Sequence, residues 1–265
     1  MSDAWFSEKL APDGDTTDGC HPDEAQALKK YLCQEISAGE AAHAITRPIL
    51  NSKTPYDDLP RLWGFLMDAL IELPSDTSRV LGLLQAIEDL PEPDMSVIEE
   101  SQRPDKLWRG LPGFGHLWAD LYQSGDWRAE AAKANTQERK RLREYHVRKA
   151  EIEARLVASN LASIPIDWGY ETVADALEKS DALLDFQIPA AAEWFRHAGD
   201  RFRMGAAKGE ESWALKRKRD LWEGGSAMTL ERWSFWEKRL GDIQSECEET
   251  ILAVEEAKVA MKGGK

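Results

Sequence analysis

Three titratable side chains with complementary chemistry lie close together within residues 187–204. Glu193 and His197 are four residues apart, and His197 and Asp200 are three apart. At about 100° per residue of an α-helix, the three side chains share one face, opposite an apolar stripe, and can reach one another. Carboxylates beside an imidazole are suited to acid–base catalysis, and both residue types bind metal ions. The alternative interpretation is the polar face of an amphipathic helix, paired internally or with Arg196.

A second pair of the same kind is His116 and Asp120, which lie one helical turn apart and opposite the apolar face of their own predicted helix. This pair also fits an ordinary solvated surface. If the two predicted helices faced each other across a cavity, the acid–base interpretation of both groups would gain support together, but sequence spacing does not determine that. The catalytic candidates are His197, Glu193, Asp200, His116 and Asp120.

Eleven tryptophans give the chain a large aromatic inventory. Each can bury 150–250 Å² of surface, so we expect most of them to form the hydrophobic core. Aromatic side chains also line many pockets for planar apolar ligands, which makes a few of these residues candidates for ligand binding. These candidates are Trp108, Trp118, Trp194, Trp233 and Trp236.

Common catalytic, nucleotide-binding and metal-binding motifs are absent from the sequence. There is no His-Glu-x-x-His, no Walker loop, no Gly-x-Ser-x-Gly and no paired Cys-x-x-Cys. The glycines at 113 and 115 do not complete a dinucleotide fingerprint, because Trp118 stands at the third glycine position and no strand is predicted before them. Cys20 and His21 fall in a predicted tail. We therefore predict neither a cofactor nor a metal site.

Two basic runs, 139–155 and 216–219, stand out in a chain whose formal net charge is −14. The first run is interleaved with glutamates, which is typical of a solvated helix face. Nucleic-acid binding requires a concentrated basic surface, so the charge balance argues against it. An anionic small ligand, or an acidic segment folded back on these runs, stays an open alternative.

The elements that position these residues are predicted to be helices. Ala and Leu greatly outnumber the β-branched residues, and this favours helices over a large sheet. Apolar stripes separated by Pro and Gly predict an all-α fold of about nine to eleven helices, arranged as antiparallel hairpins without a significant sheet. The clearest stripe covers 59–73, between Pro55 and Pro74, and the next covers 80–87.

Two later segments complete the predicted bundle. A long helix over 137–161 is expected to place Leu142, Tyr145, Ile152 and Leu156 inside. Near the C-terminus, a seam with alternating spacings of three and four predicts a helix or helix pair with an intramolecular partner rather than a coiled-coil dimer. The seam consists of Trp233, Trp236, Leu240, Ile243, Cys247, Thr250 and Val254.

The predicted organisation is a flexible acidic tail over 1–22 and a single helical domain over 23–262. Within that domain, residues 88–105 hold seven acidic residues, one basic residue and three prolines, so we expect a surface loop there. The chain has no apolar run of the length that crosses a bilayer, and its start lacks the features of a signal peptide. We predict no membrane partner and a cytoplasmic location.

Three Trp-containing stretches carry a resemblance to a known family. They are LWRGLPGFGHLWAD at 107–120, FQIPAAAEWF at 186–195 and ERWSFWEKRL at 231–240. In this order they resemble a fungal family of all-helical proteins of unknown function, which includes the protein labelled G of an oxopyrrolidine biosynthesis cluster. The resemblance implies an intracellular protein, with some members encoded beside genes for polyketide–amino acid products. It carries over no catalytic residue.

Two functions follow as expectations. The first is a small-molecule-binding protein or cofactor-free enzyme of fungal specialised metabolism, with a Trp-lined apolar pocket that includes His116 or His197. The second is a non-catalytic helical interaction or scaffold protein, with an exposed groove and a protein partner.

Overall fold

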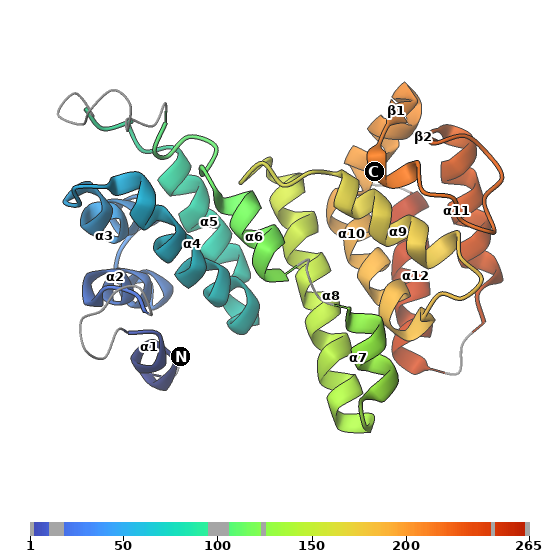
Figure 1. Cartoon of the computed structure of the whole chain (residues 1–265), viewed down its shortest axis with the longest axis horizontal. Helices are drawn as coiled ribbons and strands as arrows, with labels where there is room; N and C mark the ends of the chain where they lie inside the picture. Colours follow the sequence, from blue (N-terminus) through green and yellow to red (C-terminus); the bar gives the residue numbers. More distant parts are fainter. Residues whose placement is uncertain (1–2, 11–18, 95–105, 123–125, 245–246, 263–265) are drawn as a thin grey trace. The chain divides into compact units, whose positions relative to one another are not determined.

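The computed structural model describes residues 3–10, 19–94, 106–122, 126–244 and 247–262. Helices dominate the described residues, and their one sheet consists of two short strands, so the all-α prediction is confirmed. The chain divides into two compact units (Figure 1). Unit 1 comprises Met1–Gly125 with Leu161–Ser163, and unit 2 comprises Asp126–Asn160 with Ile164–Lys265. The prediction of a single domain over 23–262 did not include this division.

Unit 1 is built around α4, whose apolar stripe supplies fully buried Leu62, Trp63, Leu66 and Leu70. Proline begins both α2 and α4, where its missing N–H costs no helical hydrogen bond. The helices of unit 1 are α1 (Asp3–Lys9), α2 (Pro22–Leu32), α3 (Ala38–Leu50), α4 (Pro55–Glu72), the 3₁₀ turn η1 (Pro74–Asp76), α5 (Thr77–Glu88) and α6 (Phe114–Tyr122).

The N-terminal segment differs from the predicted flexible tail over the residues that the structure describes. Asp3–Lys9 forms α1, and Phe6 is buried. The Trp5 ring stacks on Phe65 with 5.7 Å between centroids. Lys9 Nζ lies 2.7 Å from an Asp68 carboxylate oxygen and 2.9 Å from one of Glu72. Aromatic packing and ion pairs therefore attach this segment to the unit. Residues 11–18 of the predicted tail lie outside the described residues.

The acidic segment after α5 has a structural role at its described ends. Glu92 accepts hydrogen bonds from the backbone N–H groups of Leu107, Trp108 and Arg109, at 2.7 to 3.2 Å for the shortest contact of each. Glu88 accepts one from Gly110, whose φ of +78° suits a residue without a side chain. These carboxylates satisfy the backbone donors of the turn that leads to α6. Residues 95–105 of the predicted loop lie outside the described residues.

Unit 2 is built around α10, which packs most extensively against α8, α12 and α9 (Figure 1). Its core is aromatic: Trp194, Phe195 and Phe202 of α10 meet Trp233 and Trp236. The elements of unit 2 are α7 (Trp127–Lys133), α8 (Thr136–Ala158), α9 (Asp167–Leu177), α10 (Leu184–Lys208), β1 (Glu210–Glu211), the 3₁₀ turn η3 (Trp213–Leu215), β2 (Ala227–Met228), α11 (Leu230–Asp242) and α12 (Glu248–Lys262).

The predicted C-terminal seam is split between two helices. Trp233, Trp236 and Leu240 are buried on α11, while Thr250 and Val254 are buried on α12. Both helices pack against α10 and against each other. The seam is therefore a tertiary contact within unit 2. No helix in the described part of the chain has both the length and the apolar character needed to cross a bilayer.

Candidate functional site

The predicted acid–base trio on α10 divides, with Glu193 beside His197 and Asp200 paired with Arg203. His197 Nε2 lies 3.3 Å from Glu193 Oε2, and the side chains are 26% and 12% exposed. Glu193 also pairs with Arg196 at 3.2 Å. Asp200 is 86% exposed and contacts Arg203 at 2.5 Å instead of His197. The spacing of four residues places Glu193 beside His197, whereas Asp200, three residues after His197, pairs with Arg203.

The second predicted pair lies in the other unit. His116 and Asp120 are exposed on α6 of unit 1, whereas Glu193 and His197 belong to α10 of unit 2. Each pair is therefore a separate group of residues within its own unit. Their roles in catalysis stay predictions.

The five candidate tryptophans are buried within their units. Trp108, Trp118, Trp194 and Trp236 are at most 1% exposed, and Trp233 is 7% exposed. Trp118 stacks on Phe114 and Trp194 stacks on Phe202, with centroid distances of 6.3 and 6.0 Å. None of the five lines either of the two hollows described below. In the described structure these residues act as core.

The larger hollow lies between α7 and α8 of unit 2 and has a volume of about 670 Å³. Its surface is mainly apolar, with half-buried Leu142 and a Tyr145 side chain that is 41% exposed. We call it the α7–α8 hollow. It is lined by Glu130, Lys133, Ala134, Glu138, Arg141, Leu142, Glu144 and Tyr145.

Local capping fixes the two helices that form this hollow. Asp126 accepts a hydrogen bond from Ala129 N–H at the start of α7. Asn135 caps α8 by accepting from Gln137 and Glu138 N–H, and Glu138 accepts from Asn135 N–H in return. This reciprocal arrangement is a capping box, which fixes where a helix begins. Because α8 begins directly after α7 ends, the two helices form a hairpin with the hollow between them.

An aromatic cluster anchors the same hairpin to α10. The His146 ring lies 4.4 Å from Trp127 and 6.2 Å from Phe186, measured between centroids. Arg139 makes three hydrogen bonds to the Asp185 carboxylate and lies over Phe186. Burial lowers the pKa of the His146 imidazole to about 3, and the neighbouring positive charges act in the same direction. His146 is therefore neutral at physiological pH and contributes as a packed ring.

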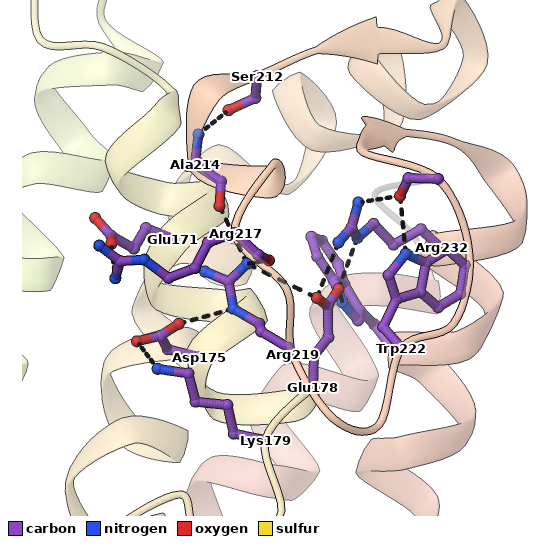
Figure 2. Close-up of polar contacts among 12 residues, drawn as sticks. Glu171, Asp175, Glu178, Lys179, Ser212, Ala214, Arg217, Arg219, Trp222 and Arg232 are labelled. Carbon is purple, nitrogen blue, oxygen red and sulfur yellow. Dashed lines mark hydrogen bonds and ion pairs between the residues drawn. The ribbon is translucent and has the colours of Figure 1, made fainter.

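A network of buried charges holds residues 210–229 against α9, and Figure 2 shows it in close-up. We call this segment the strap. Glu178, directly after α9, accepts hydrogen bonds from Arg232 Nε and Nη2 at 2.6 and 2.9 Å and from Trp236 Nε1 at 2.7 Å. Arg232 Nη1 donates to the carbonyls of Gly225 and Ala227 in the strap. One arginine thus links α11, the end of α9 and the strap.

A second buried arginine fixes the middle of the strap. Arg219 Nε donates to Asp175 of α9 at 2.8 Å, and its Nη1 donates to the carbonyls of Ala214 and Arg217 (Figure 2). Burial acts to raise the pKa of Asp175, but its hydrogen bonds and ion pairs with Lys179 and Arg219 outweigh this and lower it below the usual value. The carboxylate stays ionised at physiological pH, so it has no proton to donate.

This network pairs the two arginines of the basic run 216–219. Arg217 pairs with Glu171 of α9 at 2.9 Å, and Arg219 is buried against Asp175. Of the other run, Arg139 pairs with Asp185 and Arg143 with Glu249. Carboxylates of the same unit therefore neutralise much of the charge that a nucleic acid would need.

The smaller hollow lies in unit 1 and has a volume of about 380 Å³. Cys20 and Arg61 line it, together with Lys9 and Asp68. Cys20 is buried rather than part of a loose tail, and burial raises the pKa of its thiol to about 12. This keeps the thiol protonated and weakly nucleophilic. Among the described residues, no cluster of three or more His, Cys, Asp or Glu side chains could hold a metal ion.

The sequence contained one signal for the α7–α8 hollow. The stripe Leu142, Tyr145, Ile152 and Leu156 is expected to face inward along its whole length. Ile152 and Leu156 are fully buried, whereas Leu142 is half-buried and Tyr145 is exposed. The stripe thus continues beyond the part of α8 that is covered. Periodicity identifies the apolar face but not where its cover ends.

A known protein family matches most of this chain. The model of a family described as "Protein of unknown function (DUF3632)" matches residues 63–240, which is more than half of the chain. The chain belongs to the DUF3632 family. The DUF3632 match runs from within α4 to α11, so it contains both the α7–α8 hollow and the strap. Neither curated proteins nor solved structures give a significant match. Membership in DUF3632 assigns no reaction to the chain.

Proposed function

We propose that this DUF3632 protein binds an apolar small molecule in the α7–α8 hollow and performs no chemistry on it. The observation that carries the proposal is the apolar surface of Leu142 and Tyr145 in a hollow of about 670 Å³. Typical pockets for small ligands have volumes of about 300–1,000 Å³ and apolar walls with a few polar groups. The charged residues at the edge of the hollow provide those polar groups.

The state of the candidate acid–base groups favours binding over catalysis. Glu193 and His197 lie beside each other, and Asp200 contacts Arg203. A general acid or base must be able to exchange a proton with substrate, and carboxylates already paired with arginine, as Glu193 is with Arg196 and Asp200 with Arg203, are poorly suited to this.

The biological setting forms part of the same proposal. The resemblance of the Trp-containing stretches to a fungal family suggests a ligand from fungal specialised metabolism and a cytoplasmic location. A family resemblance of this kind suggests where the protein works but does not give its mechanism.

The test is retention of small molecules by the purified full chain from an extract of the producing organism, with identification by mass spectrometry. Leu142→Asp places a charge in the hollow, and Leu50→Asp is the matched control, because Leu50 is 44% exposed on α3 of unit 1. We expect wild type and Leu50→Asp to retain the same apolar compound and Leu142→Asp to lose it. Equal retention by all three proteins, or retention by none, would overturn the proposal.

The second candidate function is a helical interaction protein, and one observation favours it. Ile251, Leu252 and Val259 are 48%, 58% and 72% exposed on α12, whose other side packs against α10. Exposed aliphatic side chains on one helix are typical of a docking surface. Capture of a partner that Val259→Glu abolishes and Leu142→Asp leaves unchanged would favour this function over small-molecule binding.

A further inference from the structure

The positive charges around the α7–α8 hollow differ in whether they have partners. Between Arg128 and Lys149 the chain has eight basic and three acidic residues. Most of the basic side chains reach carboxylates of the same unit, for example Arg128 with Asp175 and Arg148 with Glu151. Lys133 and Arg141, which line the hollow, have no hydrogen-bond or ion-pair partner among the described residues. Two unpaired cations therefore stand at the edge of an apolar surface.

Two of the three acidic side chains that line the hollow already have partners. Glu138 accepts a hydrogen bond from Asn135 N–H as part of the capping box of α8. Glu144 lies 3.8 Å from Lys140. Glu130 is the remaining acidic residue of the lining, and its carboxylate has no partner in the part of the chain that the structure describes. The side chains free to contact a ligand are thus two cations and one anion.

We infer that the ligand of the α7–α8 hollow is an apolar carboxylic acid, bound as its carboxylate. This inference rests on the proposed function and adds the chemical class of the ligand. The hydrocarbon body covers Leu142 and Tyr145, which gains the free energy of removing apolar surface from water. The carboxylate lies between Arg141 and Lys133. A guanidinium can donate two parallel hydrogen bonds to a carboxylate, and an ammonium adds a point charge.

The test compares two probes that differ only in the charged group: dansyl-undecanoic acid and its methyl ester. Binding to the full chain is followed by dansyl fluorescence below the concentration at which either probe forms micelles. We expect the acid to bind about three- to tenfold more tightly than the ester at low salt, as one or two exposed ion pairs allow. Added salt should weaken binding of the acid and leave the ester unchanged.

Variants that remove positive charges show which residues cause the tighter binding of the acid. The double variant Lys133→Gln/Arg141→Gln should bind acid and ester equally, while Lys216→Gln, at an exposed lysine of the strap, should behave as wild type. Leu142→Asp should weaken both probes. If wild type binds acid and ester equally, the inference is wrong and the proposed function stands. If neither probe binds, or if Leu142→Asp binds both normally, the proposed site itself is wrong. Binding to anionic vesicles without binding of the free acid would also overturn the inference.

Discussion

Arg232 and Glu178 form a doubly hydrogen-bonded ion pair in the interior of unit 2, with N–O distances of 2.6 and 2.9 Å. The Arg232 side chain is 1% exposed and the Glu178 side chain is 0% exposed. The same guanidinium lies 5.0 Å from the Trp222 ring centroid and holds two carbonyls of the strap. Arg232 thereby fixes a segment that has little regular secondary structure of its own.

Replacing this arginine should destabilise the protein strongly. Arg232→Met keeps an unbranched apolar stem but leaves the buried Glu178 carboxylate without its hydrogen-bonded cation, and Arg219 Nη1 is then its nearest positive charge, at 4.0 Å. Breaking a buried pair in this way costs about 3–5 kcal/mol of unfolding free energy. The measurement is urea denaturation monitored by tryptophan fluorescence. Adding Glu178→Gln to Arg232→Met should restore part of the loss, since the uncompensated charge is then removed.

The exposed pair on the same strap provides the control. Arg217 and Glu171 are 63% and 32% exposed, so Arg217→Gln should cost no more than about 1 kcal/mol. A loss for Arg232→Met that does not exceed the loss for Arg217→Gln would contradict the assigned role of the buried pair.

His146 should make stability depend on pH in the mildly acidic range. Its pKa is lowered from 6.5 to about 3 in the folded protein, so between these values the unfolded chain binds a proton that the folded protein does not. Stability from this group is fully present above pH 6.5 and is lost as pH falls. The expected loss between pH 7 and pH 5 is about 1–2 kcal/mol.

His146→Phe should remove this part of the pH dependence, because phenylalanine keeps an aromatic ring beside Trp127 but cannot be protonated. His43→Phe is the matched control, since His43 is exposed on α3. Denaturation curves at pH 7 and pH 5 check both variants. If His146→Phe loses as much unfolding free energy between pH 7 and pH 5 as wild type does, another group is responsible for the pH dependence.

Two helical glycines should respond oppositely to alanine. A Cβ at Gly169 of α9 would lie 2.5 Å from Trp194 Cε3, whereas a Cβ at Gly199 of α10 would meet its nearest neighbour, the Ala260 carbonyl oxygen, at 3.9 Å. Gly169→Ala should cost about 1–3 kcal/mol through overpacking. Gly199→Ala should stabilise by about 0.5–1 kcal/mol, because glycine is the poorer helix former. Thermal unfolding distinguishes the two signs, and a stable Gly169→Ala would show that the aromatic core can rearrange.

The docking of α1 should be measurable as a separate stabilising contact. Phe6 is 5% exposed, and its ring packs against Trp5 at 5.0 Å. Phe6→Ala should lower the unfolding free energy by about 1–3 kcal/mol, less than for a central core residue since α1 can detach. Ser7→Ala, at an exposed position of the same helix, should have little effect. Unfolding curves of Phe6→Ala that match wild type would support the predicted loose tail.

The sequence by itself determined the helices that carry a clear apolar stripe, because the signals of such helices are local. The stripe over 59–73 and its flanking prolines predicted α4, and the stripe over 80–87 predicted the inner face of α5. Helix length, apolar face and ending depend on residues a few positions apart, and these interactions survive in any tertiary setting. The same reasoning correctly excluded a large sheet.

Only the tertiary structure decided which polar residues work together. Arg219 appeared in the sequence as one member of an exposed basic run, yet it is buried against Asp175, 44 residues away. Charges far apart in sequence leave no periodic signal, and an apolar stripe does not reveal what covers it. For this reason the uncovered side chains of Leu142 and Tyr145 emerged only from the packing of α7 and α8.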